Sequence, residues 1–245
     1  MNATKLSLLL MAVAAVGGTV IAVQAETPPK LNNAKEVGDS EERTVKAVTD
    51  ARKAYQDSLL KLHEVYTKSG EKERAKWVED ELRGYHLAPK PAYHLGDVPP
   101  AKLEAKENIK EANELYRQAM TYKDKGFGSE YTLNQRRAEM LFQEILEKYR
   151  TSDKIADVAY ELGDLYESRA YKQYARAALY YERSSQWRKG GRIDSRMRAA
   201  KLYDKQLGDR AKAIELYRDV VAHDTDHDRI KDAEKRLAEL TGTKR

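Results

Sequence analysis

Apolar residues recur at three- and four-residue intervals along most of this chain, which is the spacing of one face of an α-helix. The pattern is clear in residues 41–84, where the apolar positions are Val45, Val48, Ala51, Tyr55, Leu59, Leu62 and Tyr66. The alternation of apolar and polar residues that marks a half-buried β-strand is not sustained anywhere. The hydropathy pattern therefore predicts an all-α protein.

The prolines divide the chain into blocks. All six lie in two short stretches, at positions 28–29 and 89–100. Proline lacks an amide donor and clashes with the preceding turn of a helix, so these stretches are predicted to be linkers. The predicted order is a flexible linker over 26–40, a helical hairpin over 41–84, a Pro-rich linker over 85–101 and a long helical region over 102–245.

The long helical region repeats an order of small and aromatic residues. Small residues let two helices cross closely, an aromatic residue fills the next turn, and a second helix opens with another small residue. One copy consists of Tyr160, Leu162, Gly163 and Tyr166, followed by Tyr174, Ala177, Tyr181 and Ser184. The next consists of Ala199, Ala200, Tyr203 and Gly208, followed by Ala213, Tyr217 and Val220. An upstream copy carries an insertion, 127–137, between its two helices, and 41–84 offers a weaker fourth copy.

This order of residues resembles the tetratricopeptide repeat (TPR). Residues 142–167 look like the repeats of exported bacterial envelope proteins, of the cell-division coordinator and outer-membrane assembly lipoprotein families. The resemblance implies a right-handed α-solenoid of stacked helical hairpins, with residues 228–240 as a capping helix. It identifies no partner, because such repeats serve many functions. A helical bundle in which the tyrosines recur by chance is the alternative.

The resemblance also implies a binding surface, because the first helix of each hairpin lines the inner side of such an array. Mapped onto this chain, the groove residues are Asn113, Tyr116, Met120, Lys123, Asp157, Tyr160, Asp164, Glu167, Met197, Lys201 and Lys205. The tyrosines and methionines among them would suit an extended peptide or a partner helix. For any single charged residue, an ordinary solvated helix face is the alternative.

The amino terminus has the pattern of a signal peptide. Lys5 precedes an apolar run over 6–23, and Val23 and Ala25 place small residues three and one positions before Glu26. We expect cleavage after residue 25 and an exported product, periplasmic or envelope-associated, with no membrane span left. An uncleaved N-terminal anchor is the alternative, because about 18 apolar residues can cross a bilayer. The chain has no cysteine, which excludes lipidation at such a residue, disulfides and thiolate metal sites.

Charge adds a second candidate surface. The chain is 35% charged, above the roughly 25% of typical globular proteins, as expected of a thin repeat array. The most basic stretch, 169–201, holds ten Lys or Arg residues against Glu182 and Asp194, interleaved with tyrosines. Three interpretations stay open: a solvated face, a binding surface for an anionic envelope polymer or acidic protein, and a nucleic-acid surface, which export makes unexpected. Candidate anion-binding residues are Arg188, Arg192 and Arg196.

Signatures of catalysis are broken or absent in the sequence. His63-Glu64 is followed by Thr67 in place of the second histidine of a helical zinc protease, and no glycine-rich phosphate loop follows a predicted strand. We therefore expect no catalytic residues and no cofactor. The predicted function is a non-catalytic protein–protein interaction scaffold of the bacterial envelope. The alternatives are a cell-wall or anionic-polymer binder that uses 169–201, and a hydrolase whose carboxylates converge only in space.

A run of aspartates near the carboxyl terminus begins like a calcium loop but does not complete one. The alternating carboxylates are Asp224, Asp226, Asp228 and Asp232. Arg229 stands where the loop needs glycine and Lys235 where it needs the bidentate acid. No metal site is predicted.

Calcium or zinc should therefore leave the thermal unfolding curve of the protein unchanged. A site that binds only the folded chain would raise the melting temperature by mass action. A saturable rise on titration with either metal, followed by circular dichroism, would contradict the prediction.

Overall fold

The computed structural model describes residues 34–88, 90–91, 93, 95, 98–103, 105–188 and 194–242. The predicted signal peptide, residues 26–33 of the predicted linker and Arg192 lie outside the described residues. The chain divides into two units, 1–41 and 42–245. Of the first, only residues 34–41 are described, and they form the first turns of a helix. Among the described helices, none is both long and apolar enough to cross a membrane.

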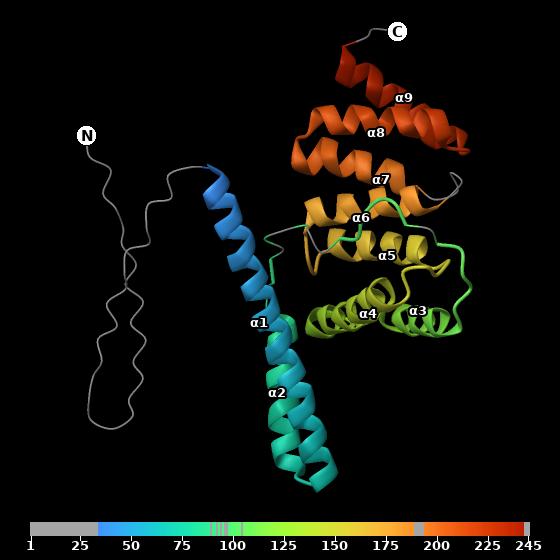
Figure 1. Ribbon diagram of the computed structural model, residues 1–245. Helices are drawn as coiled ribbons and strands as arrows, with labels where there is room; N and C mark the ends of the chain where they lie inside the picture. The colour runs from blue at the N-terminus through green and yellow to red at the C-terminus, as the bar shows by residue number, and fades with distance from the viewer. Residues whose placement is uncertain are drawn as a thin grey trace, which may run out of the picture. The chain divides into compact units, whose positions relative to one another are not determined.

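Regular structure in the described residues is helical, which confirms the all-α prediction (Figure 1). The helices are α1 (Ala34–Ser69), α2 (Lys72–Leu87), α3 (Lys110–Tyr122), α4 (Gly128–Lys148), α5 (Ile155–Glu167), α6 (Tyr174–Trp187), α7 (Ser195–Leu202), α8 (Arg210–His223) and α9 (His227–Thr241). Helix α7 continues into a π-helical turn, η1 (Tyr203–Leu207), which ends at Gly208 in the left-handed conformation, with φ at 70°. An isolated β-bridge joins Glu107 to Ser152.

Two predicted boundaries are wrong. The flexible linker was expected to reach residue 40, but α1 begins at Ala34. No proline follows Pro29 in that stretch, so nothing stops the helix from extending toward the amino terminus. The insertion 127–137 was expected between two helices, but residues 128–137 form the first turns of α4. Its polar residues hid the helix, because Asn134 and Gln135 are buried and their side-chain amides donate to Lys125 O and Asp124 Oδ1 of the preceding turn.

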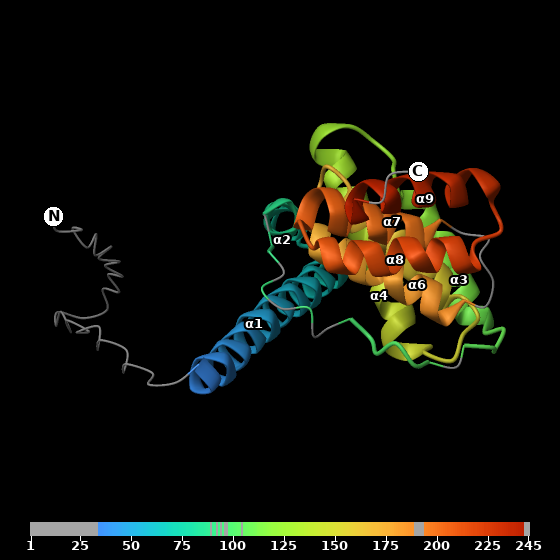
Figure 2. The same ribbon diagram turned by 90° about the horizontal axis from the view of Figure 1, so that it is seen from above.

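Consecutive helices of the second unit pack against one another from α3 to α9. The pairs are α3–α4, α5–α6 and α7–α8, and α9 packs on α8, as Figures 1 and 2 show. One cluster of buried side chains runs through all of these helices. Its fully buried alanines bring the helices close together, and they include Ala112, Ala119, Ala138, Ala159, Ala177, Ala199 and Ala213. The expected stacking of adjacent helix pairs is therefore present.

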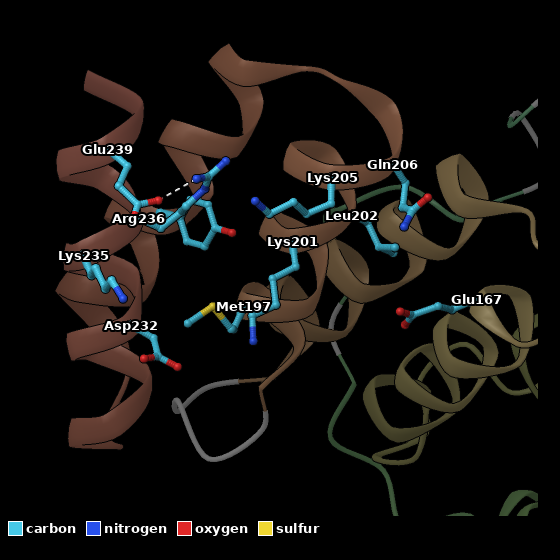
Figure 3. A pocket seen from close by; sticks show the side chains of 11 residues that line it. Glu167, Met197, Lys201, Leu202, Lys205, Gln206, Asp232, Lys235, Arg236 and Glu239 are labelled. Atoms are coloured by element: carbon cyan, nitrogen blue, oxygen red, sulfur yellow. Dashed lines mark hydrogen bonds and ion pairs between the residues drawn. The ribbon is translucent and has the colours of Figure 1, made fainter. Parts of the chain in front are cut away.

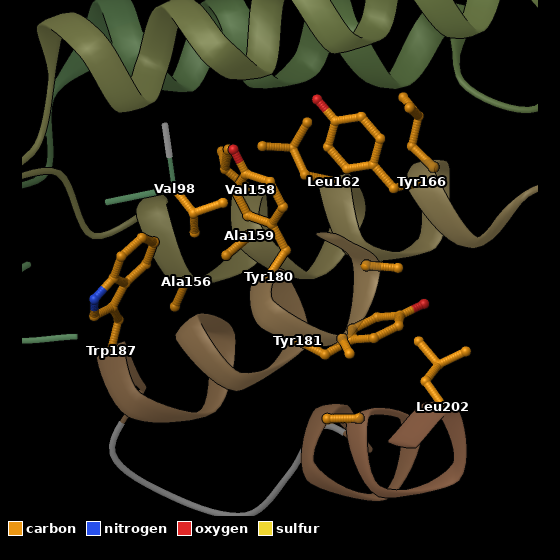
Figure 4. Packing of buried hydrophobic residues seen from close by; sticks show 14 of the residues in the cluster. Val98, Ala156, Val158, Ala159, Leu162, Tyr166, Tyr180, Tyr181, Trp187 and Leu202 are labelled. Carbon is orange, nitrogen blue, oxygen red and sulfur yellow. The ribbon is translucent and has the colours of Figure 1, made fainter. Parts of the chain in front are cut away.

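One close crossing lies between α5 and α6, where Gly163 faces Tyr181 (Figure 4 shows the surrounding core). A Cβ atom on Gly163 would lie 2.7 Å from Cδ1 of Tyr181. The ring cannot easily move away, because it is fully buried and its hydroxyl donates to Glu167 Oε2 (2.8 Å) and accepts from Arg198 Nη1 (2.7 Å). Only glycine fits at position 163 in this packing.

The end of the predicted Pro-rich linker is docked on the helix stack. Val98 and Pro99 are buried. Side chains of α6 reach the backbone carbonyls of this segment: Arg183 Nε donates to Pro99 O (2.7 Å) and Trp187 Nε1 to Pro100 O (3.2 Å). Proline lacks an amide donor but keeps its carbonyl, so α6 supplies the donors that this segment needs.

Replacing Gly163 with alanine should lower the free energy of unfolding by about 1–2 kcal/mol, because overpacking against Tyr181 outweighs the better helix propensity of alanine. Gly84 is the matched control, since it also lies within a helix but has no atom within 4 Å of an added Cβ. G84A should keep or raise stability by up to about 1 kcal/mol. Denaturant unfolding of both variants measures the effect, and a G163A protein as stable as wild type would disprove this account of the crossing.

Candidate partner-binding site

Charged side chains join α3, α5 and α7, which are the first helices of the three packed pairs. Lys123, at the carboxyl end of α3, donates to Asp164 Oδ2 of α5 at 2.5 Å. Arg198 of α7 donates to the other oxygen of the same carboxylate at 2.6 Å. The Lys123 side chain is only 7% exposed, and those of Asp164 and Arg198 are about one-third exposed. Asp164 therefore bridges two cations that come from the helix pairs on either side of its own.

Further carboxylates extend this arrangement. Glu161 lies 3.2 Å from Lys123, and Arg198 lies 3.3 Å from Asp194 and 3.6 Å from Glu167. We call the set the ion-pair network, and its members are Lys123, Glu161, Asp164, Glu167, Asp194 and Arg198.

Two tyrosines are anchored to the ion-pair network. The Tyr160 hydroxyl donates to Asp194 Oδ1 at 2.8 Å and that of Tyr116 to Glu161 Oε1 at 3.5 Å. Burial raises the pKa of Tyr116 to about 12, and the neighbouring Glu161 acts in the same direction. Both phenols are therefore neutral donors at neutral pH.

The electrostatics around Lys123 and Asp164 favour the charged forms of these two side chains. Burial alone would raise the pKa of the Asp164 carboxyl, but Lys123 and Arg198 hold it below its usual range. Burial likewise opposes the charge of Lys123, but the hydrogen bonds that it donates to Asp124 and Asp164 raise the pKa of this lysine above its ordinary value. Lys123 and Asp164 thus form a charged pair within the chain at neutral pH.

Beside this network lies an open cavity of about 420 Å³, between α7 with η1 on one side and α9 on the other (Figure 3). Its lining residues are Glu167, Met197, Lys201, Leu202, Lys205, Gln206, Tyr217, Asp232, Lys235, Arg236 and Glu239. Met197 and Leu202 are buried and give the cavity an apolar floor. Its polar residues come from α5, α7, η1, α8 and α9, with Tyr217 as the contribution of α8.

An ion pair fixes the two walls of the cavity. Arg236 of α9 donates to both oxygens of Asp204 in η1, from Nε at 2.7 Å and from Nη2 at 2.8 Å. The Tyr217 hydroxyl of α8 donates to the same carboxylate at 3.3 Å. Because the Asp204 side chain is only 4% exposed and Arg236 holds its pKa below the usual range, the contact is charged and largely shielded from water.

The charges left over in the cavity are mostly positive. Arg236 is paired with Asp204 and Glu239. Lys201 and Lys235 have no carboxylate within 4.0 Å in the described part of the chain, and Lys205 lies at 3.6 Å from the already paired Asp204. Three lysines therefore border an apolar floor, with Asp232, Glu167 and Glu239 as opposing charges in the lining. Such a site can hold an apolar side chain next to an acidic group.

Four of the eleven predicted groove residues line this cavity: Glu167, Met197, Lys201 and Lys205. Glu167 sits at its edge and is already bonded to Tyr181, whereas the two lysines are exposed. This part of the predicted surface is thus brought together in space.

The other seven predicted residues do not reach the cavity. Lys123, Asp164, Tyr160 and Tyr116 belong to the ion-pair network or are bonded to it, as described above. Asp157 pairs with Arg188, and the Asn113 side-chain amide donates to Asn108 Oδ1 at 2.6 Å. Met120 is exposed on α3. Most of these polar side chains make contacts within the chain, which limits what they offer a partner.

Sequence reasoning missed the α9 wall of the cavity. Residues 228–240 were read only as a cap, and their apolar face does pack as expected, with Ala233 and Leu240 buried. The signal was present in the spacing of Asp232, Arg236 and Glu239, since residues four and seven apart lie on one helix face. That face borders the apolar one and turns toward the cavity (Figure 3).

The candidate anion-binding residues have different surroundings. Arg188 pairs with Asp157, Arg196 is half-buried on α7, and Arg192 lies outside the described residues. Elsewhere in the basic stretch, Arg169 lies over the Tyr131 ring at 4.3 Å and Arg183 donates to Pro99 O. Arg169, Arg183 and Arg188 of the basic stretch thus already contact other parts of the chain.

The aspartates near the carboxyl terminus are engaged in the turn before α9. Asp226 Oδ1 accepts from the amides of Asp228 and Arg229 and caps the helix, and both Asp224 oxygens accept from Arg229. Among the described residues, no three His, Asp or Glu side chains lie close enough together to hold a metal ion.

Comparison with known proteins gave no relative: no family model, no curated protein and no solved structure matches the chain.

Asp164→Asn should lower the free energy of unfolding at neutral pH by about 1–3 kcal/mol, since it leaves Lys123 and Arg198 without their shared carboxylate. The pKa of Asp164 is lowered in the folded state, so its contribution is present above the ordinary carboxyl pKa and is lost as pH falls through the folded value. Denaturant unfolding at several pH values should show the difference from wild type shrinking in acid.

The control for this measurement is Asp50→Asn. Asp50 also pairs with a lysine, Lys46, but both side chains are more than 60% exposed. This variant should change stability little. An equal loss of unfolding free energy in the two variants would show that the position of Asp164 between two cations does not add to stability.

Proposed function

We propose that this chain is a non-catalytic protein–protein interaction scaffold of the bacterial cell envelope, which holds a segment of a partner protein in the cavity between α7, η1 and α9. The observation that carries the proposal is the composition of that cavity, a buried apolar floor of Met197 and Leu202 under three lysines. A site of this kind recognises one apolar side chain with acidic residues near it.

We further propose that the stacked helix pairs form a TPR-like right-handed α-solenoid. The Gly163–Tyr181 crossing, the buried alanines between helices and the capping position of α9 support this assignment. So does the ion-pair network, which brings α3, α5 and α7 together through side chains on the first helix of each pair. In such an array the first helices share one surface, and the cavity opens beside the last of them.

Export to the envelope rests on the amino-terminal pattern, the basic start, apolar run and small residues before Glu26. The alternative proposal, an anionic-polymer surface on Arg188, Arg192 and Arg196, has weaker support, because Arg188 is already paired with Asp157.

Reversing two cavity charges should weaken partner binding strongly. In cells, a photo-crosslinking amino acid at Gln206 should capture a reproducible partner, and the double variant K201E/K205E should reduce that crosslink at least about tenfold, equivalent to about 1.4 kcal/mol. Mass spectrometry of the crosslinked peptide should identify a segment with acidic residues beside an apolar one.

The matched control is R218E/K231E, which changes the net charge equally at exposed residues of α8 and α9 outside the cavity. It should leave the Gln206 crosslink intact. No partner captured from Gln206, or the same loss in both double variants, would refute the cavity as the binding site.

A further inference from the structure

A second cavity, of about 380 Å³, lies between three separate parts of the chain. Its walls are the segment that follows α2, the amino-terminal half of α4, and the loop and first turn that begin α6. Four basic residues line it: Lys90, Arg136, Lys172 and Arg176. Among the fourteen described residues around it, none is acidic.

Among the described residues, a buried carboxylate, Glu139 of α4, lies behind this cavity. It pairs with Arg136 at 2.8 Å and accepts the hydroxyls of Tyr166 (2.7 Å) and Tyr171 (2.5 Å). Burial would raise the pKa of Glu139, but Arg136, Arg176 and these hydroxyls keep it below its usual value. Glu139 is thus engaged by Arg136 and two hydroxyls, whereas Lys90 and Lys172 have no carboxylate within 4.0 Å among the described residues.

Lys90 carries the excess charge most directly. Its ammonium lies 4.0 Å from the centre of the Tyr85 ring and donates to backbone carbonyls of Tyr85 and Ala88, so its described contacts are with neutral groups. Burial, with Arg136 next in weight, lowers the pKa of Lys90 to about 8. The same cations and burial hold the pKa of His86 at about 4, so this histidine is neutral and adds no charge. An anion in the cavity would relieve this repulsion.

The beginning of α6 adds hydrogen-bond donors on the same side. Its first three residues, Tyr174, Ala175 and Arg176, line the cavity, and the preceding Gln173 gives no side-chain cap. The first turn of α6 also lacks an acidic residue. Amides at a helix start favour a negatively charged oxygen, and here they supplement the four side-chain cations.

We propose that this cavity binds a phosphate ester, whose phosphate would lie among Lys90, Arg136, Lys172 and Arg176. The multiple charge and several oxygens of a phosphate match guanidinium and ammonium donors from three directions. The organic part would lie against the rings of Tyr171 and Tyr174, which also line the walls. The volume suits a small molecule or a single headgroup, and the site is separate from the cavity between α7, η1 and α9.

Phenyl phosphate tests both parts of the site, with inorganic phosphate and phenol as its two halves. Calorimetric titration of the full-length protein should give saturable binding of phenyl phosphate, with a lower dissociation constant than that of inorganic phosphate or of phenol. Lys90→Gln and Lys172→Gln should each weaken it at least about fivefold, and Lys172 is exposed, so its variant should not disturb folding. The matched control is Lys201→Gln in the other cavity, which should change the affinity less than about twofold.

Two results would overturn the proposal: no saturable binding of phenyl phosphate or inorganic phosphate by wild type, or an equal loss in K201Q and K172Q. Sedimentation with phosphatidylglycerol vesicles separates the two sources of such a phosphate. Vesicle binding that is lost in K90Q assigns a lipid headgroup to the site, whereas phenyl phosphate binding without vesicle binding assigns a free phosphate ester. Either result supports the phosphate site.

Discussion

The contact between Gly163 and Tyr181 is the constraint on which most of the described structure depends. It sets how closely α5 and α6 approach, because the ring occupies the space that any larger residue at 163 would need. The same tyrosine reaches outward through its hydroxyl to Glu167 and Arg198. Arg198 belongs to the ion-pair network and Glu167 lines the cavity beside α7. One buried side chain thus links helix packing to the geometry of the proposed binding site.

The ion-pair network explains how a highly charged chain builds an ordered helix stack. Lys123, Asp164 and Arg198 come from three different helix pairs, yet each is placed by the packing of its own helix. Burying these charges costs solvation free energy, and the cost is offset by ion pairs that use both oxygens of Asp164 and the neighbouring carboxylates. The network therefore favours one alignment of the adjacent helix pairs over alignments in which a helix is shifted along its axis. These charges hold helices together, whereas Lys201, Lys235, Lys90 and Lys172 at the two cavities have no carboxylate within 4.0 Å among the described residues.

The sequence was sufficient to predict the helices and their pairing, because apolar spacing and small residues such as Gly163 act locally. It was insufficient where a side chain's role depends on a distant partner. Asn134 and Gln135 read as loop residues until the turn that they contact is known. Lys123 and Asp164 were expected to face a partner, and their separation of 41 residues hid that they face each other. Lys90 and Arg136 could not be grouped with Lys172 for the same reason.

The π-helical turn η1 gives the end of α7 a property that a regular helix would lack. A turn of this kind accommodates an extra residue within a helix without moving the segments on either side. Here Lys205 and Gln206 of this turn line the cavity, whereas Ala199, Ala200 and Leu202 of α7 are buried. The mouth of the cavity can consequently change in length or residue order while Ala199, Ala200 and Leu202 keep their packing. The specificity of the proposed binding site can thus change by substitution in this turn at little cost to the fold.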